Sequence, residues 1–342
     1  MKKRRNDSKI DFVITWVDGN DLKWQKEKRN YSNNLEHSDH EDDREQRYRD
    51  WDNLKYWFRG IEKFAPWVNR IHFVTWGHLP KWLDIGHPKL HIVNHKEIIK
   101  EEFLPTFNSH TIEWNLHRIK GLTEQFVYFN DDMFLLNHVK KEDFFQCGKP
   151  VDMLALQPDI ANPYDETMPY IYLNNAMVLA KYFDKYENVK KQPFAYFRIG
   201  YPLMYFMYNL LEMAFPRFTG FYTVHGPSPL KKDTFKILWK LEPELLNNVC
   251  MHRFRSKEDI SQCVLREYQK LSGCFVPKNV HKLCRYYNIS ENNQKLIQTI
   301  KKQKSKIICI NDSNHEIDFE ASKREINQAF HYILKEKSSF EK

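Results

Sequence analysis

Two adjacent aspartates interrupt an apolar run in the middle of the chain. The segment from Phe126 to Leu135, FVYFNDDMFL, has the composition of a buried strand and carries Asp131 and Asp132. Carboxylate oxygens are the ligands that Mg²⁺ prefers, and Mg²⁺ bridges readily to a substrate diphosphate. The alternative is a turn in which the aspartates cap a following helix. The residues alone support both interpretations about equally.

A similar boundary lies near the N-terminus, where the strand-like DFVITWV is followed by Asp18 and Gly19. Glycine would allow the backbone to approach a ligand closely. Taken by itself, this motif favours a plain Asp-Gly turn.

The segment FNSHTIEWNLHRI combines polar groups on a predicted helix. Glu113 and His117 are four residues apart and share a helix face with His110, and Asn108 precedes them. Such a face could supply a general base or a metal ligand beside a phosphate-binding Arg118. A polar helix face with one hydrogen-bonded histidine is the alternative, and it is favoured for any single histidine.

Two polar segments in the second half of the chain could bind phosphate. HGPSPLKKD holds His225 in a loop constrained by Gly and Pro, ahead of Lys231, and such a loop suits proton transfer or a phosphate contact. RFRSKED places Arg253 and Arg255 before a helix start with the capping pattern Ser256 to Asp259, which favours anion binding. A surface turn and an ordinary capping box are the alternatives, and each is favoured in isolation.

The elements that must position these residues alternate between strands and helices, which predicts an α/β sheet. Ligands gather at the carboxyl ends of strands in such sheets, where Asp18 and Asp131–Asp132 fall. The polar stretch 23–49 suits a mobile loop. From Met168 onward we expect mostly helix, and after Glu316 a charged helix whose last residues fray.

The 342-residue composition is that of a globular protein, with 42% hydrophobic residues and a net charge of +8. A basic balance fits phosphorylated substrates or anionic lipid, and the absence of a nucleic-acid-binding motif argues against nucleic acid. The sequence contains no CxxC pair, which argues against a zinc ribbon, and it contains no apolar run that resembles a signal peptide. The stretch 201–215 is too short to span a bilayer and predicts a buried helix, with a helix resting on a membrane as the minority interpretation.

Together these motifs resemble the Stealth proteins, bacterial capsular-polysaccharide hexose-1-phosphate transferases related to the eukaryotic GlcNAc-1-phosphotransferase that marks lysosomal enzymes. The first Stealth region is similar to IDFVITWVDGND, and the second to the segments from Asp52 to Leu83 and from Pro105 to Leu135. The third is similar to the sequence from NNAMVLA to HGPSPLKK, and the fourth to KSKIICINDS.

The resemblance implies transfer of a sugar 1-phosphate from a UDP-sugar to a sugar hydroxyl, with release of UMP. The family's essential residues match Glu113, Asp132 and His225, and most closely Arg255, with Arg253 as the alternative arginine. Asp18 matches the opening motif, where the nucleotide is expected. His225 is implied as general base, phosphate contact or, less favoured, nucleophile.

The implied fold is a nucleotide-sugar-transferase-like, GT-A or Rossmann-like mixed sheet with helices on both faces and a mostly helical section. We expect a basic tail over 1–9 and one catalytic domain over 10–315, with an α/β core over 10–165, a helical section over 166–315 and a charged tail over 316–342. The cofactor is expected to be Mg²⁺ or Mn²⁺ on Asp131 and Asp132. Asp18, Gly19, Asn108, His117, Arg118, Lys231 and Arg253 are expected to contact substrate.

A metal-dependent glycosyltransferase that releases UDP is the nearest rival function, and a non-catalytic glycan-binding component of capsule assembly is a more distant one. The expected partners are a UDP-sugar and a glycan acceptor, either free or lipid-linked. The expected location is the cytoplasm, with possible peripheral attachment to the inner face of the membrane through the basic N-terminus.

Overall fold

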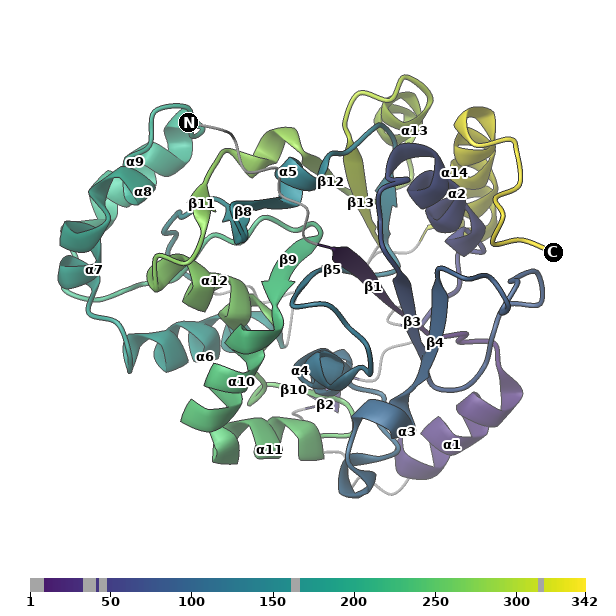
Figure 1. The fold of residues 1–342 in the computed structure, drawn as a ribbon, viewed down its shortest axis with the longest axis horizontal. Helices are drawn as coiled ribbons and strands as arrows, with labels where there is room; N and C mark the ends of the chain where they lie inside the picture. Colours follow the sequence, from purple (N-terminus) through teal and green to yellow (C-terminus); the bar gives the residue numbers. More distant parts are fainter. Residues whose placement is uncertain (1–8, 33–40, 43–47, 161–166, 313–316) are drawn as a thin grey trace.

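A five-stranded sheet forms the centre of the computed structural model, which describes residues 9–32, 41–42, 48–160, 167–312 and 317–342 (Figure 1). Its strand order is β4-β3-β1-β5-β9, and all neighbouring strands are parallel except β5 and β9. Their bounds are β1 Ile10–Trp16, β3 Ile71–Thr75, β4 Leu90–Asn94, β5 Gln125–Phe129 and β9 Ser228–Lys231.

Alternating side chains of the central strands enter two cores on opposite faces of this sheet. Phe12 and Ile14 of β1 lie in one core with helices α2, α13 and α14, whereas Val13 lies in the other with α4, α10, α11 and α12. The prediction of a mixed α/β sheet with helices on both faces is therefore confirmed.

The longer helices are α1 Leu22–Ser32, α2 Leu54–Phe64, α4 Ser109–Asn115, α6 Met168–Ala180, α7 Lys185–Lys191, α9 Leu203–Glu212, α10 Lys232–Leu241, α11 Pro243–Met251, α12 Cys263–Leu271, α13 Gln294–Lys301 and α14 Phe319–Ile333. Single-turn helices are α3 His95–Ile98, α5 Lys141–Phe144 and α8 Pro193–Tyr196, with 3₁₀ turns at Glu101–Phe103, Leu116–Arg118 and Val280–Lys282.

A second sheet of order β12-β13-β6 adjoins the first, and β6 follows β5 after a short turn. Its strands are β6 Met133–Leu135, β12 Cys284–Asn288 and β13 Ile307–Asn311. The segment Phe126–Leu135 is therefore not one strand, as we expected, but two strands of different sheets joined at the aspartates. Short strands complete the fold: β2 Glu41–Asp42 pairs with β10 Arg255–Ser256, and β8 Lys149–Asp152 pairs with β7 Phe145–Gln146 and β11 Val276–Pro277.

The second half of the chain does not form a separate helical body. Strand β9 extends the central sheet, and β13 pairs with β6, so residues after 166 complete both sheets. The expectation that the last residues fray is wrong: Phe340 is buried, and Glu341 receives a bidentate contact of 2.7 Å from the buried Arg59. A buried guanidinium needs an anion, and the chain end supplies it.

Two further expectations differ from the structure. Residues 22–32 form α1 rather than a mobile loop, because Asp21 caps the helix and Trp24 packs against Phe107; residues 33–40 and 43–47 of that stretch lie outside the described residues. Helix α9, expected to be buried, exposes a row of apolar side chains. Within the described parts of the chain, no helix has both the length and the apolar character required to cross a membrane.

Candidate active site

A cleft of about 710 Å³ opens at the carboxyl ends of β1 and β5. Chain order reverses here, because the strands after β1 are first added on the β3 side and then, with β5, on the other side. Such a switch point is where ligands bind in α/β sheets. The cleft is lined by Glu113, Asp131, Asp132, His225 and Arg255, which the sequence analysis had singled out from four separate segments.

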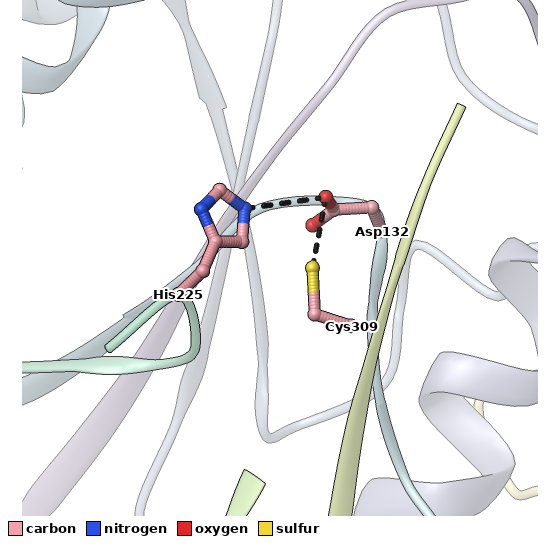
Figure 2. Close-up of side chains that lie close together, drawn as sticks. All are labelled: Asp132, His225 and Cys309. Atoms are coloured by element: carbon pink, nitrogen blue, oxygen red, sulfur yellow. Dashed lines mark hydrogen bonds and ion pairs between the residues drawn. The ribbon is translucent and has the colours of Figure 1, made fainter. Parts of the chain in front are cut away.

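Asp132 lies in the turn between β5 and β6, and strand β13 fixes its position. Its backbone oxygen accepts a hydrogen bond of 2.9 Å from the Ile310 amide, and its Oδ2 accepts one of 3.2 Å from the Cys309 thiol (Figure 2). Burial, and then the Asp132 charge, raise the pKa of this thiol well above its usual value, so it stays protonated as a donor. Oδ1 of Asp132 is buried and has no hydrogen-bond partner among the described residues.

His225 faces Asp132 from the loop that precedes β9. Its Nε2 lies 3.7 Å from Asp132 Oδ2, and its half-exposed ring meets Tyr286 edge-on at 5.1 Å between ring centroids (Figure 2 shows the first contact). The loop can lie this close because residue 226 is glycine: a Cβ there would be 3.0 Å from Cys284 Sγ. A second contact also holds the loop, since Arg266 donates a hydrogen bond of 2.8 Å to the Val224 carbonyl.

These side chains are suited to hold a divalent cation. One ligand atom each from Asp132, His225 and Cys309 lies within 4.8 Å of the other two. The unpartnered, buried Oδ1 of Asp132 is a further free acceptor. Carboxylates suit Mg²⁺ or Mn²⁺, whereas imidazole and thiol shift preference toward softer ions.

Asp131 is open to the cleft beside Asp132. Desolvation by the surrounding protein, and then the Asp132 charge, raise the pKa of its carboxyl to about 7. The side chain is exposed in the cleft, and its carboxylate and that of Asp132 repel each other. A bound cation would remove the repulsion.

Glu113 projects from α4 into the cleft and is almost fully buried. Its Oε1 accepts a 3.1 Å hydrogen bond from Tyr128 of β5, whose hydroxyl also lies 3.1 Å from Thr15 of β1. Burial raises the pKa of the Glu113 carboxyl, although the charges of His110 and Arg255 oppose this. Its Oε2 has no hydrogen-bond partner among the described residues, which leaves one carboxylate oxygen for a ligand.

Arg255 reaches the cleft from β10 and donates a 3.0 Å hydrogen bond to Ser109 at the start of α4. The loop that carries it is fixed by the buried Asp259, which accepts hydrogen bonds from the Ser256 amide, His110 and His252. Burial alone would raise the pKa of Asp259, but these hydrogen bonds lower it. The capping pattern of the sequence is real, and it joins the Arg255 loop to the Glu113 helix.

Other residues expected to contact substrate have structural partners instead and do not line the cleft. Asn108 caps α4 and donates a hydrogen bond of 2.8 Å to Asp259. His117 stacks on Phe235, because α4 ends at Asn115 and the following 3₁₀ turn rotates it away from Glu113.

The expected phosphate-binding cations are also outside the cleft lining. Arg118 lies over the Trp239 ring, Lys231 is 3.8 Å from Glu124, and Arg253 donates to the carbonyls of Pro105 and Glu102.

The first motif borders the cleft through Thr15–Val17, while Asp18 lies beyond its lining. The Asp18 amide donates a hydrogen bond of 2.8 Å to His78, and the Asp18 carboxylate accepts a hydrogen bond from the Asn20 amide. Gly19 is required by a close approach, but to protein: a Cβ there would clash with the Tyr48 carbonyl at 1.9 Å.

Tyr128 and Tyr286 in the cleft, and Cys309 behind Asp132, were not predicted as site residues. Cys309 and Tyr128 are fully or almost fully buried and look like ordinary strand residues in the sequence. The available signal was the resemblance, because Tyr128 lies in the segment similar to the second Stealth region and Cys309 in the segment similar to the fourth.

Comparison with known proteins identifies the family. Two family models match: Stealth protein CR1, conserved region 1, over residues 8–36, and Stealth protein CR2, conserved region 2, over residues 47–152. The chain is 40% identical to the capsular polysaccharide phosphotransferase WcwK of Streptococcus pneumoniae, with 99% of each chain covered. It is 37% identical to the receptor polysaccharide phosphotransferase WefC of Streptococcus gordonii, over 97% of this chain and 99% of that one. It is also 37% identical to the exopolysaccharide phosphotransferase cps2G of Lactiplantibacillus plantarum, over 97% and 96%.

A solved structure, the WbbM bifunctional glycosyltransferase, matches with a TM-score of 0.38 and 11% identity over 96% of this chain and 52% of that one. The fold description rests on the strand order above rather than on this likeness.

The chain therefore belongs to the Stealth family. Its conserved regions 1 and 2 coincide with the segments that carry Asp18, Glu113 and Asp132. The third and fourth regions, which carry His225 and Cys309, stay predictions.

Proposed function

We propose that this protein transfers a sugar 1-phosphate from a UDP-sugar to a hydroxyl of a growing capsular or cell-surface polysaccharide. The observation that carries the proposal is the meeting of Glu113, Asp132, His225 and Arg255 in one cleft at the switch point of the sheet. The printed names of the relatives, which are polysaccharide phosphotransferases, support the same reaction class.

In this reaction the acceptor oxygen forms a bond to the β-phosphorus of the donor. The bond from that phosphorus to the oxygen bridging to the α-phosphate breaks, so UMP leaves and a phosphodiester remains. The transition state places negative charge on the non-bridging oxygens, and catalysis therefore depends on positioning and charge neutralisation.

His225 is suited to take the proton of the acceptor hydroxyl, because its imidazole is accessible from the cleft and faces the Asp132 carboxylate at 3.7 Å. A carboxylate in that position orients the ring and stabilises the imidazolium as the proton arrives. A direct phosphate contact by His225 is the second use of the same geometry.

Arg255 and Glu113 supply the remaining polar groups. Arg255 offers a planar fork of donors to phosphate oxygens, held in place by Ser109. Glu113 has one free oxygen in a nearly dry position, which suits a hydrogen bond to a sugar hydroxyl.

A divalent cation, Mg²⁺ or Mn²⁺, fits the carboxylates of Asp131 and Asp132, with His225 and Cys309 as further candidate ligands. When bound, it would neutralise the donor diphosphate. His225 cannot serve both as a ligand and as a base at once, so metal dependence and the pH profile of turnover separate these two roles.

The acceptor is a glycan, and we include lipid linkage in the proposal. Nucleotide sugars are cytoplasmic, so the proposed location is the cytoplasm, with attachment to the inner face of the membrane.

The deciding experiment is incubation with a panel of UDP-sugars, a glycan acceptor and Mg²⁺ or Mn²⁺, with separate measurement of UMP and UDP. Release of UMP together with a phosphodiester product supports the proposal. Release of UDP would show a glycosyltransferase instead. The variant Asp132→Ala is the control, and it should release neither nucleotide while keeping the unfolding transition of the wild type.

A further inference from the structure

Helix α9 packs Tyr205, Asn209 and Glu212 inward and turns a row of apolar side chains outward. Asn209 and Glu212 are buried, whereas Leu203, Met204, Met207, Leu210 and Leu211 are exposed. A helix on the surface of a globular protein normally has the opposite arrangement. The outward face therefore requires an apolar neighbour.

Buried hydrogen bonds from the inward polar groups hold this orientation, although Oε2 of Glu212 has no hydrogen-bond partner among the described residues. Asn209 accepts a 2.7 Å hydrogen bond from the Leu156 amide and donates to the carbonyls of Leu154 and Tyr196. Glu212 accepts a 2.5 Å hydrogen bond from Thr219. Rotating α9 to hide its leucines would break these buried contacts, each of which would leave an unpaired polar group.

Neighbouring segments extend the outward apolar face. Phe194 of α8 is 83% exposed and Ile199 is 98% exposed, and Phe215 follows α9 on the same stretch of chain. We call these three residues and the five exposed residues of α9 the α8–α9 surface. Figure 1 shows α8 and α9 together at one end of the molecule, opposite α14 and the C-terminus.

The charges of this stretch are all of one sign. Between residues 191 and 217 the exposed ionisable residues are Lys191, Arg198 and Arg217, and the single acidic residue, Glu212, is buried. No ion pair within the described part of the chain neutralises these three cations. An apolar face bordered by uncompensated cations is complementary to an anionic lipid surface.

We propose that the α8–α9 surface docks the protein onto an anionic membrane, with α9 lying in the headgroup layer. At ten residues α9 is about 15 Å long, too short to cross a bilayer. A second copy of the chain is a poorer occupant, because a symmetric dimer through this surface would place Arg198 and Arg217 near their own counterparts. The inference deepens the proposed function, on which it rests for its purpose of holding the enzyme beside a lipid-linked acceptor.

Helix α6 connects this end of the molecule with the cleft. Its first turns line the cleft through Met168, Pro169 and Tyr172, and Leu173 and Met177 on the same helix are exposed.

The test is co-sedimentation of the full chain with vesicles of equimolar phosphatidylcholine and phosphatidylglycerol, compared with phosphatidylcholine alone. The apolar variant is Leu203→Ser with Leu211→Ser, and its matched control is Leu22→Ser with Ile85→Ser, which removes leucine and isoleucine of similar exposure elsewhere. The charge variant is Arg198→Glu with Arg217→Glu, matched by Lys302→Glu with Lys304→Glu. All replaced side chains are exposed, and unfolding curves verify that each variant folds.

We expect the wild type and both controls to bind the mixed vesicles more tightly than the neutral ones. The apolar and charge variants should each bind the mixed vesicles at least about tenfold more weakly. Equal binding by the wild type and the apolar variant would overturn the proposal, as would no binding to either vesicle. A vesicle-free dimer that only the apolar variant dissociates, without vesicle binding, would assign the surface to self-association instead. The assay contains no donor or acceptor, so its result is independent of whether the chain releases UMP.

Discussion

The imidazole of His225 and the carboxylate of Asp132 meet at 3.7 Å, although the strands that follow these two residues belong to different sheets. Asp132 leads into β6 of the second sheet, and His225 leads into β9 of the central sheet. Antiparallel pairing of β5 with β9 brings the two positions together in the central sheet, and β13 of the second sheet holds Asp132 through its backbone oxygen. The site is therefore a product of the whole fold rather than of either segment.

Replacing either member of this pair should abolish turnover without unfolding the chain. Asp132→Asn and His225→Gln should each lower kcat at least about 100-fold, because the base loses its orienting anion or is removed. The double variant should be hardly worse than either single one, since the two side chains act together. Steady-state kinetics of the three variants measures this; additive losses would contradict a shared role.

The two arginines of RFRSKED should differ sharply. Arg255 lines the cleft and contacts Ser109, whereas Arg253 is bound to backbone carbonyls outside it. Arg255→Lys should lower kcat/KM by about 10- to 100-fold, because lysine cannot reproduce the planar fork. Arg253→Lys is the matched control and should change kcat/KM less than about threefold. Equal effects of the two substitutions would contradict the assignment.

The sequence predicts much of the fold because strand and helix patterns are local. The apolar run that contains Phe12, Val13 and Ile14 predicts a strand, and the placement of Asp132 after an apolar run is also visible in the sequence. What the sequence does not contain is pairing between distant segments. The antiparallel β9 and the addition of β13 to β6 decide where His225 and Cys309 lie, and neither follows from local pattern.

The differences between the predicted site and the cleft lining have the same cause. Glu113 and His117 share a face on an ideal helix, but α4 tightens into a 3₁₀ turn after Asn115 and His117 stacks on Phe235 instead. Gly19 does mark a close approach, but the neighbour is Tyr48. The residue types predicted a polar helix face and a close backbone approach at these positions. Only the tertiary contacts decide which groups are the neighbours.

Cys309 should act as a hydrogen-bond donor to Asp132 in the Mg²⁺-dependent reaction. Cys309→Ser keeps a donor and should retain activity within about threefold, whereas Cys309→Ala leaves Asp132 Oδ2 without this partner and should lose about tenfold. Turnover with saturating Mg²⁺ measures the difference. If serine is as damaging as alanine, and both weaken Mn²⁺ binding by calorimetry, the thiol is a metal ligand.

Asp131 should make the metal-free protein less stable as pH rises. The pKa of its carboxyl is about 7 in the folded chain and 3.8 ordinarily, so between these values the unfolded chain holds fewer protons. The free energy of unfolding therefore falls as pH rises through this window. Asp131→Asn removes this effect and should be more stable than the wild type above about pH 7, by about 1 kcal/mol after allowing for solvent screening in the open cleft. The advantage should shrink toward pH 4. Urea denaturation without divalent cations measures it, and an advantage independent of pH would contradict the shifted carboxyl.

Asp259 should be required for activity although it does not line the cleft. It is fully buried and accepts hydrogen bonds from His110 on α4, from His252 and from the Ser256 amide next to Arg255. Asp259→Ala removes the acceptor for all of these groups and should destabilise the chain by about 3 kcal/mol.

The conservative variant Asp259→Asn separates positioning from stability, because it keeps the size of the side chain and one acceptor oxygen. It should fold but lower kcat/KM about tenfold, since the loop of Arg255 loses its fixed relation to Glu113. Because the folded-state pKa of Asp259 is lowered, the wild type should also lose stability as pH falls below the ordinary range of an aspartate, and Asp259→Asn should lose less. If Asp259→Asn has normal kcat/KM, the network is structural and Arg255 is held by Ser109 alone.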